Sequence, residues 1–122
     1  LQVIGEIRQG KPPKMFNESL TSFVPRSFIL EEASAYLFIA RGEDFHDELI
    51  ADGDLLVVQT GVEAEEGDAV FATMEGLVYI KNYFPEGERI RLESKKKGAL
   101  PLIFKTGEIE IQGVITAVIR QY

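Results

Sequence analysis

One lysine within a largely apolar strand has the clearest capacity for chemistry in this sequence. Lys81 directly follows the run Val78-Tyr79-Ile80. Burial disfavours the charged ammonium form of such a lysine, and a neutral lysine can take a proton from a hydroxyl nucleophile. Lys81 also alternates with Tyr79 and Tyr83 on one face of the strand. Since a lysine on a solvent-facing strand gives the same pattern, the residues alone favour a surface lysine over a base.

The sequence contains few residues that could bind a metal or act through a thiol. The chain contains no cysteine, which excludes disulfides, thiolate metal sites and cysteine nucleophiles and fits a reducing compartment. His46 is the single histidine, and we interpret it as a surface residue of a short helical turn. Asp52-Gly53-Asp54 is similar to the start of a calcium loop, but the spacing that such a loop requires does not continue. A β-turn in which Gly53 adopts a positive φ is therefore predicted, and neither a metal nor a cofactor is expected.

The charge balance argues against direct contact between this segment and nucleic acid. The net charge is -7, and the one dense basic cluster, residues 95–97, is predicted to be a solvated loop. The acidic run at residues 63–68 is interpreted as a solvated turn between strands. No apolar run approaches the ~20 residues needed to span a bilayer, and residues 1–10 lack the features of a secretory signal. We expect a cytoplasmic protein without membrane contact.

Short apolar runs and regularly spaced turn residues predict a single, mainly β domain over residues 1–122. Turn signals recur about every 8–12 residues, as in sandwiches and barrels. Residues 11–22 are predicted to be a loop, and only residues 43–51 have helical character, for one or two turns at most. Gly113 is expected to mark a bulge or bend in the last strand. The expected strands are 3–7, 36–40, 55–59, 69–74, 77–83, 89–92, 102–104 and 109–120.

The most informative stretch is residues 41–58, R-G-E-D-F-H-D-E-L-I-A-D-G-D-L-L-V-V. It resembles the signature of the LexA and UmuD family of self-cleaving serine peptidases, which also includes many phage repressors. In that family a glycine, a variable residue, a serine and a methionine precede an aspartate and then a D-G-D turn leading into an apolar strand. The positions that match here are Gly42, Asp47, Ile50, Asp52, Gly53, Asp54 and Leu55.

The resemblance continues in order along nearly the whole chain. Residues 67–70 are similar to the family's G-D-x-V strand, and residues 78–81 to the strand whose lysine, here Lys81, is the general base. Residues 101–103 and 112–120 are similar to the segments that close the domain, and residues 3–12 to the cleavage-site region. The resemblance implies a compact fold of twisted antiparallel sheets. It assigns residues 1–22 to a cleavage-region strand and loop, and residues 23–122 to a dimerisation and peptidase-like core.

Three positions depart from the family pattern. Asp44 stands where the family has its serine nucleophile, Phe45 replaces the usual methionine, and the scissile Ala-Gly becomes Gln9-Gly10. A carboxylate is a poor nucleophile toward an amide and would favour the protonated form of Lys81. We therefore expect a degenerate dyad in which Asp44 forms an ion pair with Lys81, whose disruption would cost about 3–5 kcal/mol if the pair is desolvated. None of the chain's serines, at positions 19, 22, 27, 34 and 94, is expected opposite Lys81.

The function implied by the resemblance is that of the dimerisation and regulatory domain of a bacterial, LexA-like transcriptional repressor of the DNA-damage (SOS) response, unable to cleave itself. Operator DNA would be bound by an N-terminal domain outside this chain, and a homodimer would place two such domains at half-site spacing. We expect the last strand to be an apolar edge strand that another copy covers. Its candidate dimer residues are Ile111, Val114, Ile115, Val118 and Ile119.

Two other functions remain open at this point. One is a UmuD-like accessory subunit of a translesion polymerase, which an upstream helix-turn-helix would exclude. The other is an active Ser-Lys peptidase that uses an unrecognised nucleophile, which self-cleavage before Gly10 would reveal. If cleavage is lost, another input must regulate the protein, such as a regulatory protein partner, a modification or altered abundance.

Overall fold

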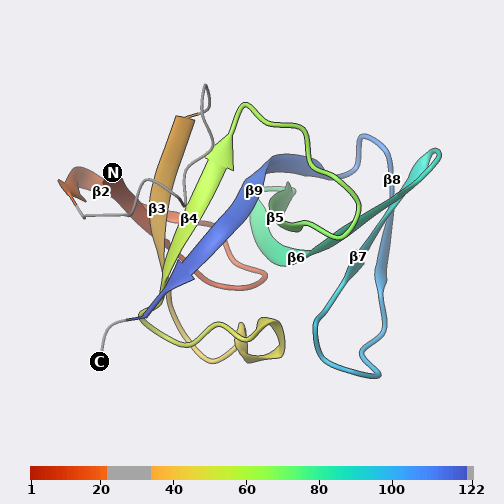
Figure 1. The fold of residues 1–122 in the computed structure, drawn as a ribbon, viewed down its shortest axis with the longest axis horizontal. Helices are drawn as coiled ribbons and strands as arrows, with labels where there is room; N and C mark the ends of the chain where they lie inside the picture. Colours follow the sequence, from red (N-terminus) through yellow and green to blue (C-terminus); the bar gives the residue numbers. More distant parts are fainter. Residues whose placement is uncertain (22–33, 121–122) are drawn as a thin grey trace.

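The computed structural model describes residues 1–21 and 34–120 and arranges them in one nine-stranded sheet (Figure 1). The prediction of a mainly β fold with at most one short helical turn is confirmed, and the helical segment is reduced to the 3-10 helix η2 (His46–Glu48). No helix among these residues is long and apolar enough to cross a membrane. The strands are β1 (Gln2–Ile7), β2 (Lys14–Thr21), β3 (Ser34–Ala40), β4 (Leu55–Thr60), β5 (Ala69–Met74), β6 (Leu77–Glu86), β7 (Arg89–Glu93), β8 (Leu102–Lys105) and β9 (Glu110–Ile119).

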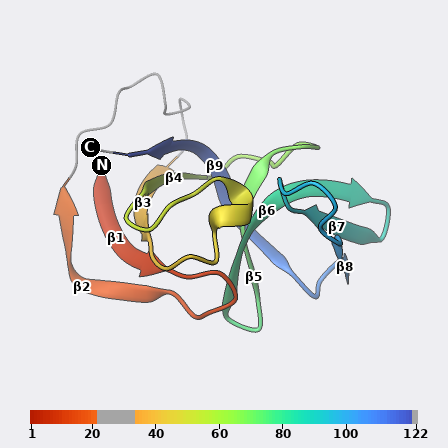
Figure 2. The same cartoon turned by 90° about the horizontal axis from the view of Figure 1, so that it is seen from below.

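The strand order is β2-β1-β3-β4-β9-β5-β6-β7-β8. All neighbouring strands pair antiparallel except β1 and β3, which are parallel. In Figure 1, β3, β4 and β9 lie side by side, while β6, β7 and β8 extend away from them on the other side of β5. The segment that joins β3 to β4 contains η2 and lies across the lower end of the sheet, as Figure 2 shows from below. This segment therefore faces β6, the strand that carries Lys81.

The prediction of a loop over residues 11–22 is wrong for residues 14–21, which form β2 and pair antiparallel with β1. β2 is the outermost strand of the sheet, and Met15 keeps 53% of its surface exposed. Because an edge strand with little burial on either face needs no alternation of apolar and polar residues, the sequence shows no period of two. Residues 22–33 lie outside the described residues, and with them Ser22, Ser27 and the expected boundary between residues 22 and 23.

The prediction that β9 is an edge strand is also wrong, because β9 lies between β4 and β5. Several of its apolar residues are partly buried against three different core clusters: Ile115 packs on one, Ile111 on a second and Ile119 on a third. The expected irregularity at Gly113 is present as register shifts on both sides of β9. Gly113 itself lies so close to β4 that a Cβ atom would come within 2.7 Å of Val58 Cγ1.

Candidate functional site

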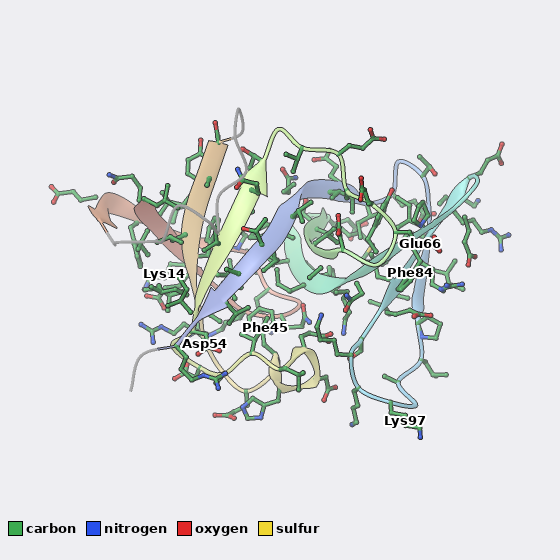
Figure 3. The ribbon with its side chains drawn as sticks, viewed as in Figure 1. Lys14, Phe45, Asp54, Glu66, Phe84 and Lys97 are labelled. Carbon is green, nitrogen blue, oxygen red and sulfur yellow. The ribbon has the colours of Figure 1, made fainter. Side chains whose placement is uncertain are left out.

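The turn between β3 and β4 is anchored in the core by Phe45, which is fully buried (Figure 3). Residues three apart in a 3-10 turn share a face, so Phe45 and Glu48 point inward while Asp44 and Asp47 point outward. Asp44 is accordingly exposed. The replacement of methionine by phenylalanine thus keeps the apolar anchor, and the residue at the nucleophile position faces solvent.

Lys81 forms an ion pair with Glu48, so the prediction that it pairs with Asp44 is wrong. Lys81 Nζ lies 3.0 Å from Glu48 Oε2, and the two side chains are only 16% and 2% exposed. The physical reason is the phase of the turn, which presents the carboxylate of residue 48 to β6 and that of residue 44 to solvent. Lys81 is therefore neither a free base nor a surface lysine, but one half of a largely buried pair.

Glu48 also receives two hydrogen bonds from the segment that follows β7. Ser94 Oγ lies 2.9 Å from Glu48 Oε2, and the backbone N–H of Lys95 donates to Glu48 Oε1 over 3.0 Å. Both carboxylate oxygens thus have partners, as a buried charge requires. Glu48 and Ser94 were missed by the sequence reasoning. The available signal was a carboxylate three residues after Phe45 in the predicted helical turn; nothing in the sequence pointed to Ser94.

The segment similar to a cleavage site lies against β6 beside Lys81. Gly10 N–H donates to the carbonyl of Val78 over 2.7 Å, and Val78 N–H donates to the carbonyl of Lys11 over 2.9 Å. The Gln9 side chain continues this pairing, because Nε2 donates to Ile80 O (3.2 Å) and Oε1 accepts from Ile80 N–H (2.9 Å). β7 pairs only with residues 82–86 of β6, so residues 9–11 cover the stretch of that edge that β7 leaves free. Gln9 and Gly10 therefore pair with the same strand, β6, that carries Lys81.

The Asp52-Gly53-Asp54 segment is a structural turn. Gly53 has φ +89°, and Asp52 Oδ1 accepts from Gly42 N–H over 2.8 Å. Asp54, only 1% exposed, accepts two hydrogen bonds of 2.8 Å from Arg120 and one from Ala51 N–H. The hydrogen bonds from Arg120 lower the pKa of the Asp54 carboxyl, against the opposing effect of burial. The β-turn interpretation is confirmed, with Asp54 tying the start of β4 to the end of β9.

The other charged residues singled out in the sequence lie at the surface. His46 Nε2 is 2.7 Å from Glu43 Oε2, with both side chains more than half exposed. Asp68 Oδ2 accepts from Glu65 N–H in the exposed acidic turn. Asp47 is exposed, and Lys97 lies at the tip of the β7–β8 connection (Figure 3). No group of three or more His, Cys, Asp or Glu side chains among residues 1–21 and 34–120 could hold a metal ion.

Fold and site together define an all-β domain in which Lys81 on β6, the turn that carries Glu48 and the chain's own N-terminal segment lie beside one another. The chain belongs to the family described as Peptidase S24-like, whose sequence profile matches residues 2–116. It is similar to the LexA repressors of Thermotoga neapolitana (34% identity, 98% of this chain, 58% of the relative) and Clostridium kluyveri (31%, 98% and 59%). The expected LexA-like C-terminal domain is therefore confirmed, and the chain spans about three fifths of the length of these relatives.

Proposed function

We propose that this chain is the dimerisation and regulatory domain of a LexA-like transcriptional repressor that does not cleave itself. One observation carries the proposal: Lys81, at the position of the family's general base, is held by the buried carboxylate of Glu48. A protonated lysine that donates a hydrogen bond to a carboxylate has no lone pair with which to accept a proton. The position of the nucleophile is filled by Asp44, which carries no hydroxyl and faces solvent.

The segment at the scissile position supports the same conclusion. Gln9 uses both ends of its side-chain amide on the main chain of Ile80, where the family's alanine would make no such contact. Ser94 is the hydroxyl nearest in the hydrogen-bond network, but it donates to the same carboxylate as Lys81 and not to the lysine. Among the described residues Lys81 thus has no hydroxyl partner from which to remove a proton.

Dimerisation is proposed for the C-terminal half of β9. Residues 115–119 pair with β4 on one edge, whereas the pairing of β9 with β5 reaches only as far as Val114. Val118 on this half-strand is 43% exposed. An exposed apolar side chain on this half-strand suits a contact with a second copy of the chain about a twofold axis. In the cytoplasm of a bacterium, such a dimer would hold two DNA-binding domains, encoded outside this chain, on operator DNA.

Two measurements test the proposal. Purified protein incubated for a day at about pH 10, where roughly a third of free lysine is neutral, is expected to keep its intact mass. A fragment that begins at Gly10 would show an active peptidase. Sedimentation velocity is expected to show a dimer that Val118→Asp dissociates and that Ile103→Asp, a matched change at an exposed isoleucine of β8, leaves intact. A monomeric parent protein would contradict the dimerisation proposal.

A further inference from the structure

A cavity of about 230 Å³ lies where β9 diverges from β5, between β6 and the turn that carries Glu48. The charged residues that line it are Glu48, Lys81 and Lys95. Its remaining wall is mainly aliphatic and includes Ile80 and Ile115. The cavity therefore combines a charged end with an apolar body.

We infer that this cavity binds a small monocarboxylate with a short aliphatic chain. The inference rests on the proposed function, because a cleft that still cleaved the Gln9–Gly10 bond would have to remain open to the chain itself. Binding of such a ligand would be a regulatory signal that could replace self-cleavage. Since β9 is also the strand proposed to pair across the dimer, a bound ligand would lie beside the interface and could alter assembly.

The charges at the cavity favour an anion. Two lysines and one carboxylate line the cavity, an excess of one positive charge in a protein whose net charge is -7. The ammonium group of Lys95 donates to the neutral side chain of Asn82 over 2.8 Å, so no second carboxylate in the described part of the chain cancels its charge there. Both oxygens of Glu48 already accept hydrogen bonds. Lys81 Nζ has three protons to donate, and Glu48 is its one partner among the described residues. A ligand carboxylate would supply acceptors for the remaining protons in a site where Lys81 is only 16% exposed.

The cavity is open to solvent on one side, and its volume gives the scale of the ligand. A cavity of about 150 Å³ holds benzene, with its six carbon atoms, so a cavity of 230 Å³ holds roughly nine non-hydrogen atoms. Hexanoate has eight and would place five carbons against the aliphatic wall. Acetate would leave that wall uncovered, and a neutral alcohol would lose the charge-assisted hydrogen bond to Lys81.

The test is a titration of the whole chain with sodium hexanoate, followed by ¹H–¹⁵N NMR. Saturable shifts are expected at the amides of Ile80, Lys81 and Thr116 at millimolar ligand or below, with hexan-1-ol and acetate each binding at least about tenfold more weakly. Ala69→Leu, which fills the cavity without changing a charge, is expected to abolish binding. Lys95→Met should weaken binding, whereas the matched change Lys97→Met at the exposed loop tip should not.

Three results would overturn the inference: no saturable shift at millimolar hexanoate, equal affinity for hexan-1-ol, or unchanged affinity in Ala69→Leu. The intact mass of the same samples separates this inference from the proposed function. A chain clipped before Gly10 would contradict the proposed function, whereas an intact chain that binds no hexanoate would contradict the ligand site alone.

Discussion

Replacing Gln9 by alanine should release residues 9–11 from β6. The Gln9 side chain makes two hydrogen bonds to Ile80, of 2.9 Å and 3.2 Å, between residues 71 positions apart. A hydrogen bond of this kind contributes about 0.5–1.5 kcal/mol net, so the pair contributes about 1–3 kcal/mol to keeping the segment in place. At about 1.4 kcal/mol for each factor of ten, opening of this segment should become roughly 5- to 150-fold more frequent in Gln9→Ala.

Amide hydrogen exchange measures this opening directly, because the N–H of Ile80 is protected by Gln9 Oε1. Protection of the Ile80 N–H against exchange should fall roughly 5- to 150-fold. The Val78 N–H donates to Lys11 O, so its protection should fall by a similar factor if residues 9–11 open as a unit. Gln112→Ala is the matched control, since Gln112 is an exposed glutamine of β9 whose bonds go to Thr73 and Glu110. Unchanged protection of Ile80 in Gln9→Ala would refute the reasoning.

Three further changes test how the turn between β3 and β4 is held. Arg120 lowers the pKa of Asp54, so this pair stabilises the fold above the ordinary aspartate value of about 4, and the contribution is lost as the pH falls through the lowered pKa. Arg120→Gln should therefore shift acid unfolding, followed by circular dichroism, to higher pH; an unchanged midpoint would contradict the role of the pair. Phe45→Ala should destabilise the fold by about 3–5 kcal/mol in urea titrations, because the ring is fully buried, whereas a loss below about 1 kcal/mol would show that the ring is no anchor. Leu49 is 75% exposed and has φ +61°, a left-handed conformation that strains any residue but glycine. Leu49→Gly should therefore raise the free energy of unfolding by up to about 1 kcal/mol, and a lower melting temperature would argue against strain there.

The strands with a buried face were predictable from the sequence, and β2 was not. β3 and β4 appear as apolar runs because they lie inside the sheet, and β6 because Val78 and Ile80 face the core. β2 is held by hydrogen bonds to β1 at the outer edge, which leave little trace in residue types. The place of β9 between β4 and β5 was equally hidden, because a long apolar strand suits an interior position as well as a covered edge.

The candidate site was predictable in part. The resemblance placed Lys81, Asp44 and Gln9 at the positions that matter, and the structure brings Gln9 and Lys81 to the same strand. The partner of Lys81 depended on the phase of a three-residue 3-10 turn, which decides whether residue 44 or residue 48 points inward. Ser94, 46 residues from Glu48 in the chain, reaches the site only because the end of β7 lies beside that turn.

The central claim is that Lys81 is committed to a buried ion pair with Glu48, and a double-mutant cycle measures this commitment. The free energy of unfolding would be determined for the parent protein, Glu48→Leu, Lys81→Met and the double variant. Each single change leaves an unpaired charge at a site where the side chains are 2% and 16% exposed, and should cost about 3–5 kcal/mol. The double variant should be more stable than either single variant, with a coupling energy of at least about 1 kcal/mol. Additivity within about 0.5 kcal/mol would show that the two side chains are independent, and would contradict the account.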